Sequence, residues 1–200
     1  MTGPDPVDRL ARALAREADR STDFDLNPGT LPAEGRILRP AAVLVALAPG
    51  AGGPSVVLTK RSSALRHHPG QIAFPGGKVD PGDASPEAAA LREAREEIGL
   101  DPQAVRLIGR LPEHETVTGY AVTPVIGRIE RPFTPVPDAS EVEEVFAVPL
   151  SHLADPARYR VERRMWRGEW RNYYIVPWGP YYIWGATARI LRGLAERLRE

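Results

Sequence analysis

Three glutamates, Glu93, Glu96 and Glu97, have the spacing in this sequence that points most directly to chemistry. On an α-helix, positions i, i+3 and i+4 project from neighbouring turns of one face. Carboxylates held this close repel one another and destabilise the helix unless a cation compensates them. Mg²⁺ prefers oxygen ligands and usually completes its shell with waters and a substrate phosphate. The spacing therefore predicts a divalent-metal site, with a solvated acidic face paired to Arg92 and Arg95 as the alternative.

A helix from about Ser85 to Ile98 is expected to carry these glutamates. Ser85 suits the N-cap, Pro86 the first helical position and Gly99 the residue just past the end. The helix follows residues 74–77, Phe-Pro-Gly-Gly, whose glycines allow a tight turn and a close approach of the backbone to a ligand. Together, the turn and the helix favour the metal site over the solvated face.

This combination resembles the signature box of the Nudix hydrolases. The box has a glycine and an acidic residue, followed by the pattern Arg-Glu-aliphatic-x-Glu-Glu-x-Gly-aliphatic. The matching residues are Gly77, Asp83, Arg92, Glu93, Ala94, Glu96, Glu97, Gly99 and Leu100. The early acidic residue is aspartate rather than glutamate, the aliphatic position before Glu96 holds a small alanine, and one extra residue separates Asp83 from Arg92.

Residues 58–77 resemble the upstream motif of the coenzyme A pyrophosphatase branch, whose box is lengthened at the same place. Further similarities at residues 118–124, 141–150 and 183–188 extend the resemblance from about Pro40 to about Leu194. It implies metal-dependent hydrolysis of coenzyme A or acyl-CoA to adenosine 3′,5′-bisphosphate and (acyl-)4′-phosphopantetheine. Two alternatives stay open: a Nudix diphosphatase of another nucleoside diphosphate-X substrate such as ADP-ribose, and a non-catalytic, nucleotide-sensing protein of the same fold. The intact glutamate set argues against the sensor.

The resemblance also implies catalytic roles. Glu96 and Glu97 are expected to bind Mg²⁺ or Mn²⁺, and Glu93 is either a third ligand or the general base. The carbonyl of Gly77 is a further expected metal ligand. Arg92 is expected to orient the glutamates.

Other carboxylates are alternative or supporting residues in this scheme. Because the base of the family sits on different elements, Glu115, Glu141 and Glu144 are alternative bases. Asp83 is expected to hold the preceding loop onto the helix N-terminus, where negative charge is favourable, with metal binding as the weaker alternative.

A basic cluster within residues 60–68 precedes the box. An ordinary solvated loop is one interpretation. A coenzyme A substrate carries a diphosphate and a 3′-phosphate, however, and arginines bind such groups through charge-assisted hydrogen bonds. The expected substrate-binding residues are therefore Lys60, Arg61, Arg66, His68 and Gly76.

The whole chain of 200 residues is long enough for one domain with a buried core. Its net charge is zero, which gives no global attraction to nucleic acid or an anionic membrane, so a small-molecule substrate is expected. Cysteine is absent, which excludes disulfides and thiolate zinc sites. The first residues lack the basic start and apolar core of a signal peptide, and a cytoplasmic location is expected. The sequence leaves open whether the chain forms a homodimer.

Hydrophobic periodicity predicts an α/β fold, and the resemblance implies a Nudix-type α/β/α sandwich with a mixed β-sheet. Residues 1–35 are expected to form an N-terminal helix, at residues 5–19, and a connecting segment packed on the domain formed by residues 36–200. Strands are expected at residues 37–48, 55–60, 104–111, 121–129 and 142–148, with a further pair within residues 159–176. Residues 114–115 are expected in a loop, residues 151–153 in a short turn or helix, and residues 184–199 in a final helix.

Overall fold

The computed structural model describes residues 6–30, 32, 35–166 and 168–199. Its helices are α1 (Pro6–Leu14), α2 (Pro86–Ile98), α3 (Leu150–Leu153) and α4 (Gly185–Arg199), with 3₁₀ turns at Pro102–Ala104 and Pro156–Arg158. Its strands are β1 (Ser21–Thr22), β2 (Arg39–Ala48), β3 (Ser55–Arg61), β4 (Ile72–Ala73), β5 (Gly76–Lys78), β6 (Val105–Arg110), β7 (His114–Glu115), β8 (Tyr120–Ile129), β9 (Val142–Pro149), β10 (Arg160–Trp166) and β11 (Glu169–Ile175).

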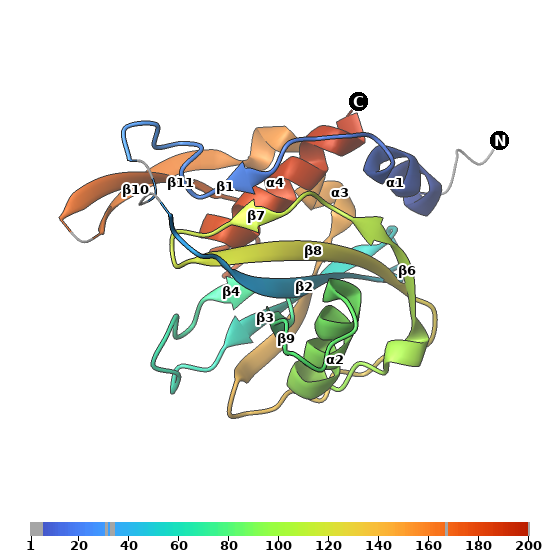
Figure 1. Cartoon of the computed structure of the whole chain (residues 1–200). Helices are drawn as coiled ribbons and strands as arrows, with labels where there is room; N and C mark the ends of the chain where they lie inside the picture. Colours follow the sequence, from blue (N-terminus) through green and yellow to red (C-terminus); the bar gives the residue numbers. More distant parts are fainter. Residues whose placement is uncertain (1–5, 31, 33–34, 167, 200) are drawn as a thin grey trace.

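Nine of these strands form one mixed sheet. Its order is β1-β7-β8-β2-β3-β4, with β5 paired to β2, β6 to β8 and β9 to β3. The long central strands β2 and β8 are parallel, whereas β3 and β5 are antiparallel to β2. Figure 1 shows α2 below this sheet and α4 with α1 above it. The predicted α/β/α sandwich with a mixed sheet is confirmed.

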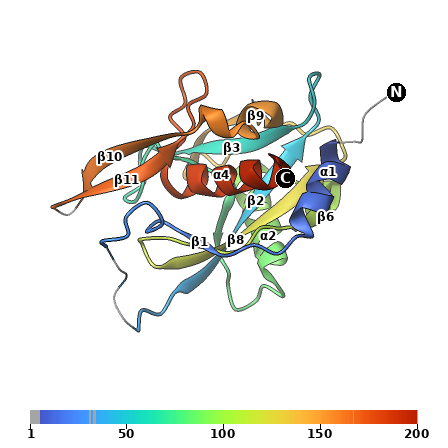
Figure 2. The same ribbon diagram turned by 90° about the horizontal axis from the view of Figure 1, so that it is seen from above.

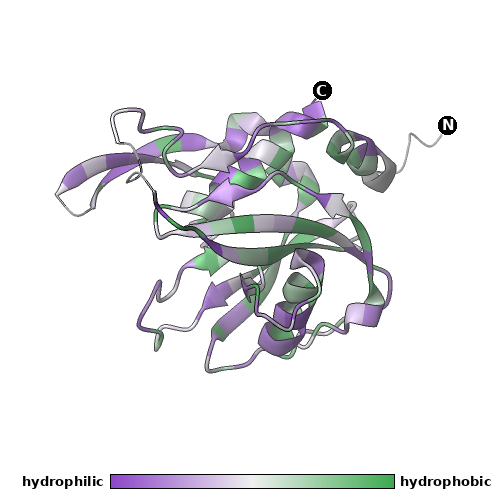
Figure 3. Ribbon diagram, in the orientation of Figure 1, coloured by the Kyte–Doolittle hydropathy of each residue, from purple (hydrophilic) through white to green (hydrophobic). Residues whose placement is uncertain are grey.

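Strand β2 divides the core because its side chains alternate between the two faces of the sheet. Val45 and Leu47 belong to a cluster of buried apolar side chains on the α4 side. Leu44 and Ala46 belong to a separate cluster on the α2 side. In Figure 3 the apolar colouring of β2 and β8 lies between the two helical layers.

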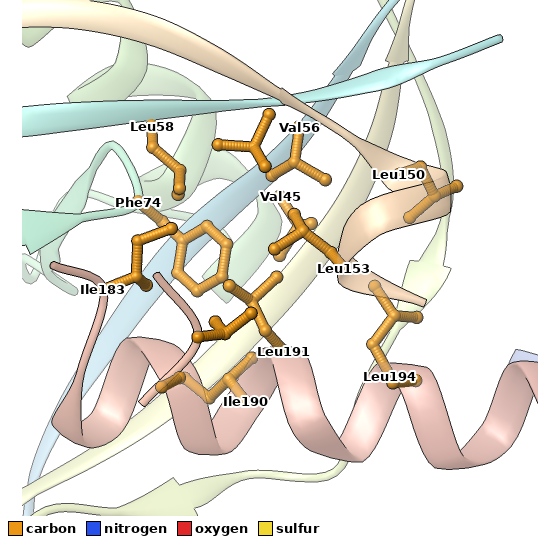
Figure 4. Close-up of a cluster of buried hydrophobic side chains, with 14 of the residues drawn as sticks. Val45, Val56, Leu58, Phe74, Leu150, Leu153, Ile183, Ile190, Leu191 and Leu194 are labelled. Atoms are coloured by element: carbon orange, nitrogen blue, oxygen red, sulfur yellow. The ribbon is translucent and has the colours of Figure 1, made fainter. Parts of the chain in front are cut away.

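Large side chains fill the α4 side. Figure 4 shows Phe74 beside Leu58, Ile183 and Leu191, with Leu194 further along α4. The α2 side is built from smaller residues, since Ala89, Ala90 and Ala94 are the fully buried residues in the middle of α2. An alanine face allows the backbone of α2 to lie close to the sheet.

The N-terminal helix is shorter than predicted, because α1 ends at Leu14, and Asp5 lies outside the described residues. It packs on α4 and β6. The guanidinium of Arg197 on α4 donates to the carbonyls of Ala13 at 2.8 and 3.1 Å and of Leu14 at 3.3 Å, and also to Arg16. The carbonyls of Ala13 and Leu14 are among those that the end of a helix leaves unpaired. The division of the chain at residue 35 stays a prediction.

The prediction of a loop at residues 114–115 is wrong, since they form β7. Strand β7 pairs parallel with β1 and antiparallel with β8. His114 is fully buried, and its ring nitrogens contact Ser21 Oγ at 2.9 Å and Asp23 Oδ1 at 3.1 Å. A segment distant in sequence thus completes the pairing, which local periodicity does not reveal.

Strands β10 and β11 form a two-stranded antiparallel sheet of their own. Figures 1 and 2 show this hairpin extending away from the rest of the molecule. Among the described residues, no helix is long and apolar enough to cross a membrane.

Candidate active site

Helix α2 begins and ends where the sequence predicts. The hydroxyl of Ser85 accepts a hydrogen bond from the Ala88 N–H at 3.2 Å. At the other end, Gly99 has φ 71°, a left-handed conformation that favours glycine, and its N–H bonds to the Arg95 carbonyl at 3.0 Å. The last turn of α2, which carries Glu96 and Glu97, is therefore fixed by the cap.

Glu97 is the buried carboxylate of the site, with only 4% of the residue exposed. Its Oε2 accepts a hydrogen bond from the Gly76 N–H at 3.1 Å. Burial raises the pKa of Glu97 to about 7, and the nearby charge of Glu93 acts in the same direction. A bound cation would stabilise the charged form of this buried carboxylate, which accepts a hydrogen bond from one backbone N–H.

Glu93 lies against the backbone of Gly77. A Cβ built on Gly77 would stand 2.5 Å from Glu93 Oε1, so a larger residue would displace this carboxylate from its position. Burial raises the pKa of Glu93, while the charge of Arg92 opposes this shift. Glycine at position 77 therefore creates the space that this carboxylate fills.

Gly76 is required for a different reason. It is paired with Val43 on β2 and has φ 154°. A Cβ there would lie 2.4 Å from the Ala42 carbonyl oxygen and 2.6 Å from Val43 Cα, so no larger residue fits. The close approach of β2 thus explains the glycine at position 76, and the position of Glu93 explains the glycine at position 77.

Arg92 connects the glutamates to the preceding loop. Its Nη1 donates to Glu93 Oε1 at 3.1 Å and to Glu96 Oε2 at 3.0 Å. Its Nη2 also donates to the Lys78 carbonyl at 3.2 Å. The surrounding carboxylates, Asp83 first, raise the pKa of Arg92 further. The guanidinium is a positioning group for two of the three glutamates, of which Glu96 is the most exposed.

Asp83 holds the loop through this arginine. Its two carboxylate oxygens accept from Arg92 Nε and Nη2, both at 3.0 Å, and Oδ2 also accepts from the Asp80 N–H at 2.8 Å. The hydrogen bonds from Arg92 lower the pKa of Asp83. Ser85, rather than Asp83, accepts the hydrogen bond at the start of α2. Asp83 therefore holds the loop through its ion pair with Arg92 rather than through the helix dipole. The Arg92 and Asp80 contacts are the parts of this loop that the sequence did not indicate.

Two more charged residues lie near the buried end of the glutamate row. The positive charge of Arg61, at the end of β3, acts on Glu97, and the negative charge of Glu141 raises the pKa of both Glu93 and Glu97. The Ser62 N–H donates to the Glu141 carbonyl at 2.8 Å, which joins the loop after β3 to the start of β9. Arg61 and Glu141 are thus brought to the site from separate strands.

The loop of residues 62–70 leaves the sheet at this edge. Arg66 and His68 are both exposed on it. His68 has φ 56°, the single positive value for a non-glycine residue in the described part of the chain. A left-handed backbone directly before Pro69 is unfavourable and marks a constrained loop.

Other candidate residues are not brought to the glutamates. Lys60 Nζ donates to Glu143 Oε1 at 2.6 Å, and alternation along β3 sends it to the face opposite Arg61. Glu144 accepts a hydrogen bond from the Tyr181 hydroxyl on that same face. Glu115 lies 3.7 Å from Arg36 Nη2, on a strand above β8 in Figure 1, whereas α2 lies below.

The site offers donors suited to a hard divalent ion. Within the described ranges no three His, Asp or Glu side chains form a ready ligand set, because Arg92 holds Glu93 and Glu96 while Gly76 holds Glu97. Two acidic groups whose pKa values burial raises are nevertheless held beside one another by the fold. A bound cation would offset both the cost of burying these carboxylates and the repulsion between them. The donor set therefore fits Mg²⁺ or Mn²⁺.

The chain matches the NUDIX domain family model over residues 38–167. It therefore belongs to the Nudix hydrolases, a class of enzymes that generally use divalent metals and act on small-molecule substrates. The match covers the glycine turn, helix α2 and the strands around them.

Individual relatives agree with this assignment. The chain is 45% identical over 160 residues to an uncharacterized Nudix hydrolase, NudL, of Enterobacter sp. (strain 638), covering 80% of this chain and 83% of the relative. The crystal structure of the Nudix hydrolase RenU of M. smegmatis is similar with a TM-score of 0.50 and 28% identity, over 62% of this chain and 84% of that chain. The MutT protein of Methanosarcina mazei Go1 shares the fold, with a TM-score of 0.53 and 19% identity over 84% and 96% of the two chains.

Proposed function

We propose that this Nudix hydrolase cleaves the pyrophosphate bond of coenzyme A or acyl-CoA. Water is added across the diphosphate, one P–O bond breaks, and the products are adenosine 3′,5′-bisphosphate and (acyl-)4′-phosphopantetheine. The observation that supports this best is the placement of the exposed basic loop, residues 62–70, at the same sheet edge as Arg61, Glu141 and the buried Glu97. An anionic substrate gripped by that loop would present its diphosphate to the glutamates.

The metal would be held by Glu93, Glu96, Glu97 and the carbonyl of Gly77. When bound, Mg²⁺ or Mn²⁺ neutralises phosphate oxygens and lowers the pKa of a coordinated water. Arg92 keeps two of these carboxylates oriented, and its own position is set by the two hydrogen bonds to Asp83.

A carboxylate would take the proton from the attacking water. Glu93 and Glu141 are the candidates near Glu97, since the negative charge of each raises the pKa of Glu97. Glu115 and Glu144 stay predictions as alternative bases, and both have other partners.

The substrate would be bound through its phosphates. Arg61, whose charge acts on Glu97, would bind the diphosphate, and the exposed Arg66 and His68 would bind the 3′-phosphate. Gly76 would let the substrate approach the backbone of β5. Lys60 is the weakest member of this set, since it is paired with Glu143. The cytoplasmic location stays a prediction.

The proposal is tested by mass spectrometry of products formed from CoA, acetyl-CoA and ADP-ribose with Mg²⁺ or Mn²⁺. We expect adenosine 3′,5′-bisphosphate and 4′-phosphopantetheine from CoA, dependent on metal. Hydrolysis of ADP-ribose without hydrolysis of CoA would retain the Nudix chemistry and refute the substrate. Tight nucleotide binding without any hydrolysis would indicate a sensor instead.

A further inference from the structure

The outward-facing backbone edge of β10, in the β10–β11 hairpin, pairs with no further strand in the described part of the chain. Strand β11 is covered at its outer edge, because Asn27 bonds both the N–H and the carbonyl of Asn172, and Trp184 bridges to Ile175. Among the strands of the described residues, β10 pairs with β11 alone. All six residues from Arg160 to Met165 are exposed.

The pairing of the hairpin determines which backbone groups this edge offers. Trp166 is paired with Glu169 across a two-residue connection, so this closing pair must be hydrogen-bonded. Bonding alternates along an antiparallel ladder, so the N–H and C=O groups of Val161, Arg163 and Met165 point away from β11. An exposed edge of this kind is a template for another strand.

One face of the hairpin also carries exposed apolar surface. Val161 is 52% exposed, Met165 49% and Trp170 59%. Register places Val161 opposite Tyr174 and Met165 opposite Trp170, so all of them lie on one face. A two-stranded hairpin is marginally stable in water and gains from additional strands.

We propose that β10 pairs antiparallel with β10 of a second copy of this chain, with the two-fold axis at Arg163. A second copy is the occupant that the strand itself fits, because the sequence from Val161 to Met165 is self-complementary in this register. Glu162 of each copy then lies opposite Arg164 of the other. Val161 of each copy lies opposite Met165 of the other.

The charges along the edge favour this register. Two Glu162–Arg164 pairs form on one face, and directly opposite charges stabilise a sheet. The two Arg163 side chains meet at the axis, but each guanidinium lies 4.9 Å from the centroid of its own Trp170 ring, which is on β11. Both guanidiniums are thus directed away from the axis.

The backbone groups that point outward from β10 agree with an axis at Arg163. Val161, Arg163 and Met165 are the positions whose backbone groups are outward, and an axis at Arg163 pairs these positions with one another. The result is a four-stranded sheet with a closed, isologous interface. Each strand is only seven residues long, and small interfaces of this size are weak, so we expect a Kd on the order of micromolar.

Sedimentation velocity across concentrations from about 1 to 500 µM, which bracket such a Kd, tests the pairing. We expect the unmodified chain to change from monomer to dimer. Glu162→Arg and Arg164→Glu should each sediment as monomers. An equimolar mixture of the two variants should form a heterodimer, because two arginines of the first variant then lie opposite two glutamates of the second. Glu169→Arg, on the same hairpin but off the β10 edge, should still dimerise. A monomer at every concentration, or dimers of both single variants, would overturn the proposal.

A cross-linking experiment tests the register independently of the charges. The chain has no cysteine, so a single introduced thiol is a clean probe. Arg163→Cys places two thiols across the axis with Cα atoms about 5.5 Å apart, within the range for a disulfide. Met165→Cys places its two thiols about 13 Å apart along the strands, too far for a disulfide. Oxidation should therefore cross-link the first variant and spare the second. Equal cross-linking of both would refute this register.

Discussion

The two faces of the large sheet are packed by different kinds of residue. On the α4 face, large apolar side chains such as Leu58, Phe74 and Leu191 are almost fully buried. On the α2 face, alanines line the helix, and a carboxylate, Glu97, is nearly as buried. Because hydrophobic stabilisation scales with the apolar area removed from water, the α4 face contributes more of it.

The main apolar core and the candidate active site thus lie on opposite faces of one sheet. The α2 face has a thin apolar layer, and its glycines and alanines let backbone and carboxylates come close together. Burial of Glu97 and Glu93 is costly without a cation. Substitutions on the two faces should therefore affect different measurements.

The largest effect on stability is expected from Leu191→Ala, on the α4 face. Leu191 is 1% exposed, and truncation of a buried leucine costs about 2–5 kcal/mol. Denaturant unfolding should show this loss, with the turnover of the folded protein unchanged. Leu107→Ala is the matched control, since Leu107 is 41% exposed and its truncation should cost far less. Loss of turnover at unchanged stability would break the comparison.

The largest effect on activity is expected from Glu97→Gln, on the α2 face. An amide is a neutral and weaker ligand for a hard cation, and the transition-state stabilisation that a metal supplies is worth several kcal/mol. We expect kcat/KM to fall by at least about 100-fold, with no loss of metal-free stability at pH 8. Glu130→Gln, an exposed glutamate paired with Arg106, is the control. Near-normal activity with Mg²⁺ would remove Glu97 from the metal site.

A smaller effect is expected from Asp83→Asn. The amide weakens the two hydrogen bonds that fix Arg92, and the loss of such a supporting group typically costs about 10–100-fold in activity or metal affinity. Steady-state kinetics at varied Mg²⁺ should show a higher metal requirement. Asp101→Asn is suited as a control because an amide oxygen can still accept from the Gln103 N–H. An unchanged metal requirement would mean that Arg92 is held without Asp83.

The pKa of Glu97 predicts how pH acts on the metal-free protein. The ordinary pKa is 4.5 and the folded value is about 7, so between these values the folded state binds more protons than the unfolded state. Stability should therefore fall as pH rises from about 4.5 to 7, by up to about 1.4 kcal/mol per pH unit. Chemical unfolding in EDTA measures this fall, which Mg²⁺ should reduce and Glu97→Gln should flatten. The same pH dependence in the variant would assign the effect to another group.

The smallest effect is expected at the exposed loop. Arg66→Ala should raise KM for CoA about two- to fivefold, since exposed charge pairs contribute only about 0.2–1 kcal/mol. KM for ADP-ribose, which lacks the 3′-phosphate, should stay the same. Arg131→Ala, at another exposed position, controls for the change in net charge. Equal increases for both substrates would remove Arg66 from 3′-phosphate recognition.

Local signals were sufficient to predict helix α2 and the glycine turn. Ser85, Pro86 and Gly99 specify the ends of the helix by their own backbone chemistry, so the glutamate row could be placed from the sequence. The close approach at Gly76 and Gly77 was also expected, although the sequence could not say that the sheet requires one glycine and Glu93 the other.

Contacts between distant segments could not be predicted in this way. Strands β1 and β7 are two residues long and exist because residues 21–22 meet residues 114–115. Lys60 and Arg61 are neighbours in a basic cluster, yet β3 sends them to opposite faces, where Glu143 meets the first and Glu97 the second. A pattern of charges along the chain does not contain this information.

The hydrogen bonds from Arg197 to the end of α1 also constrain the order in which contacts form during synthesis of the protein. The guanidinium and the Ala13 carbonyl are separated by 184 positions in the chain. During translation α1 therefore emerges from the ribosome long before α4, which carries Arg197. The hydrogen bonds from Arg197 to the end of α1 therefore cannot form until α4 has emerged, although the contacts of α1 with β6 can form earlier. Pulse-labelled nascent chains of increasing length should show full protease protection of residues 13–16 only after α4 has emerged.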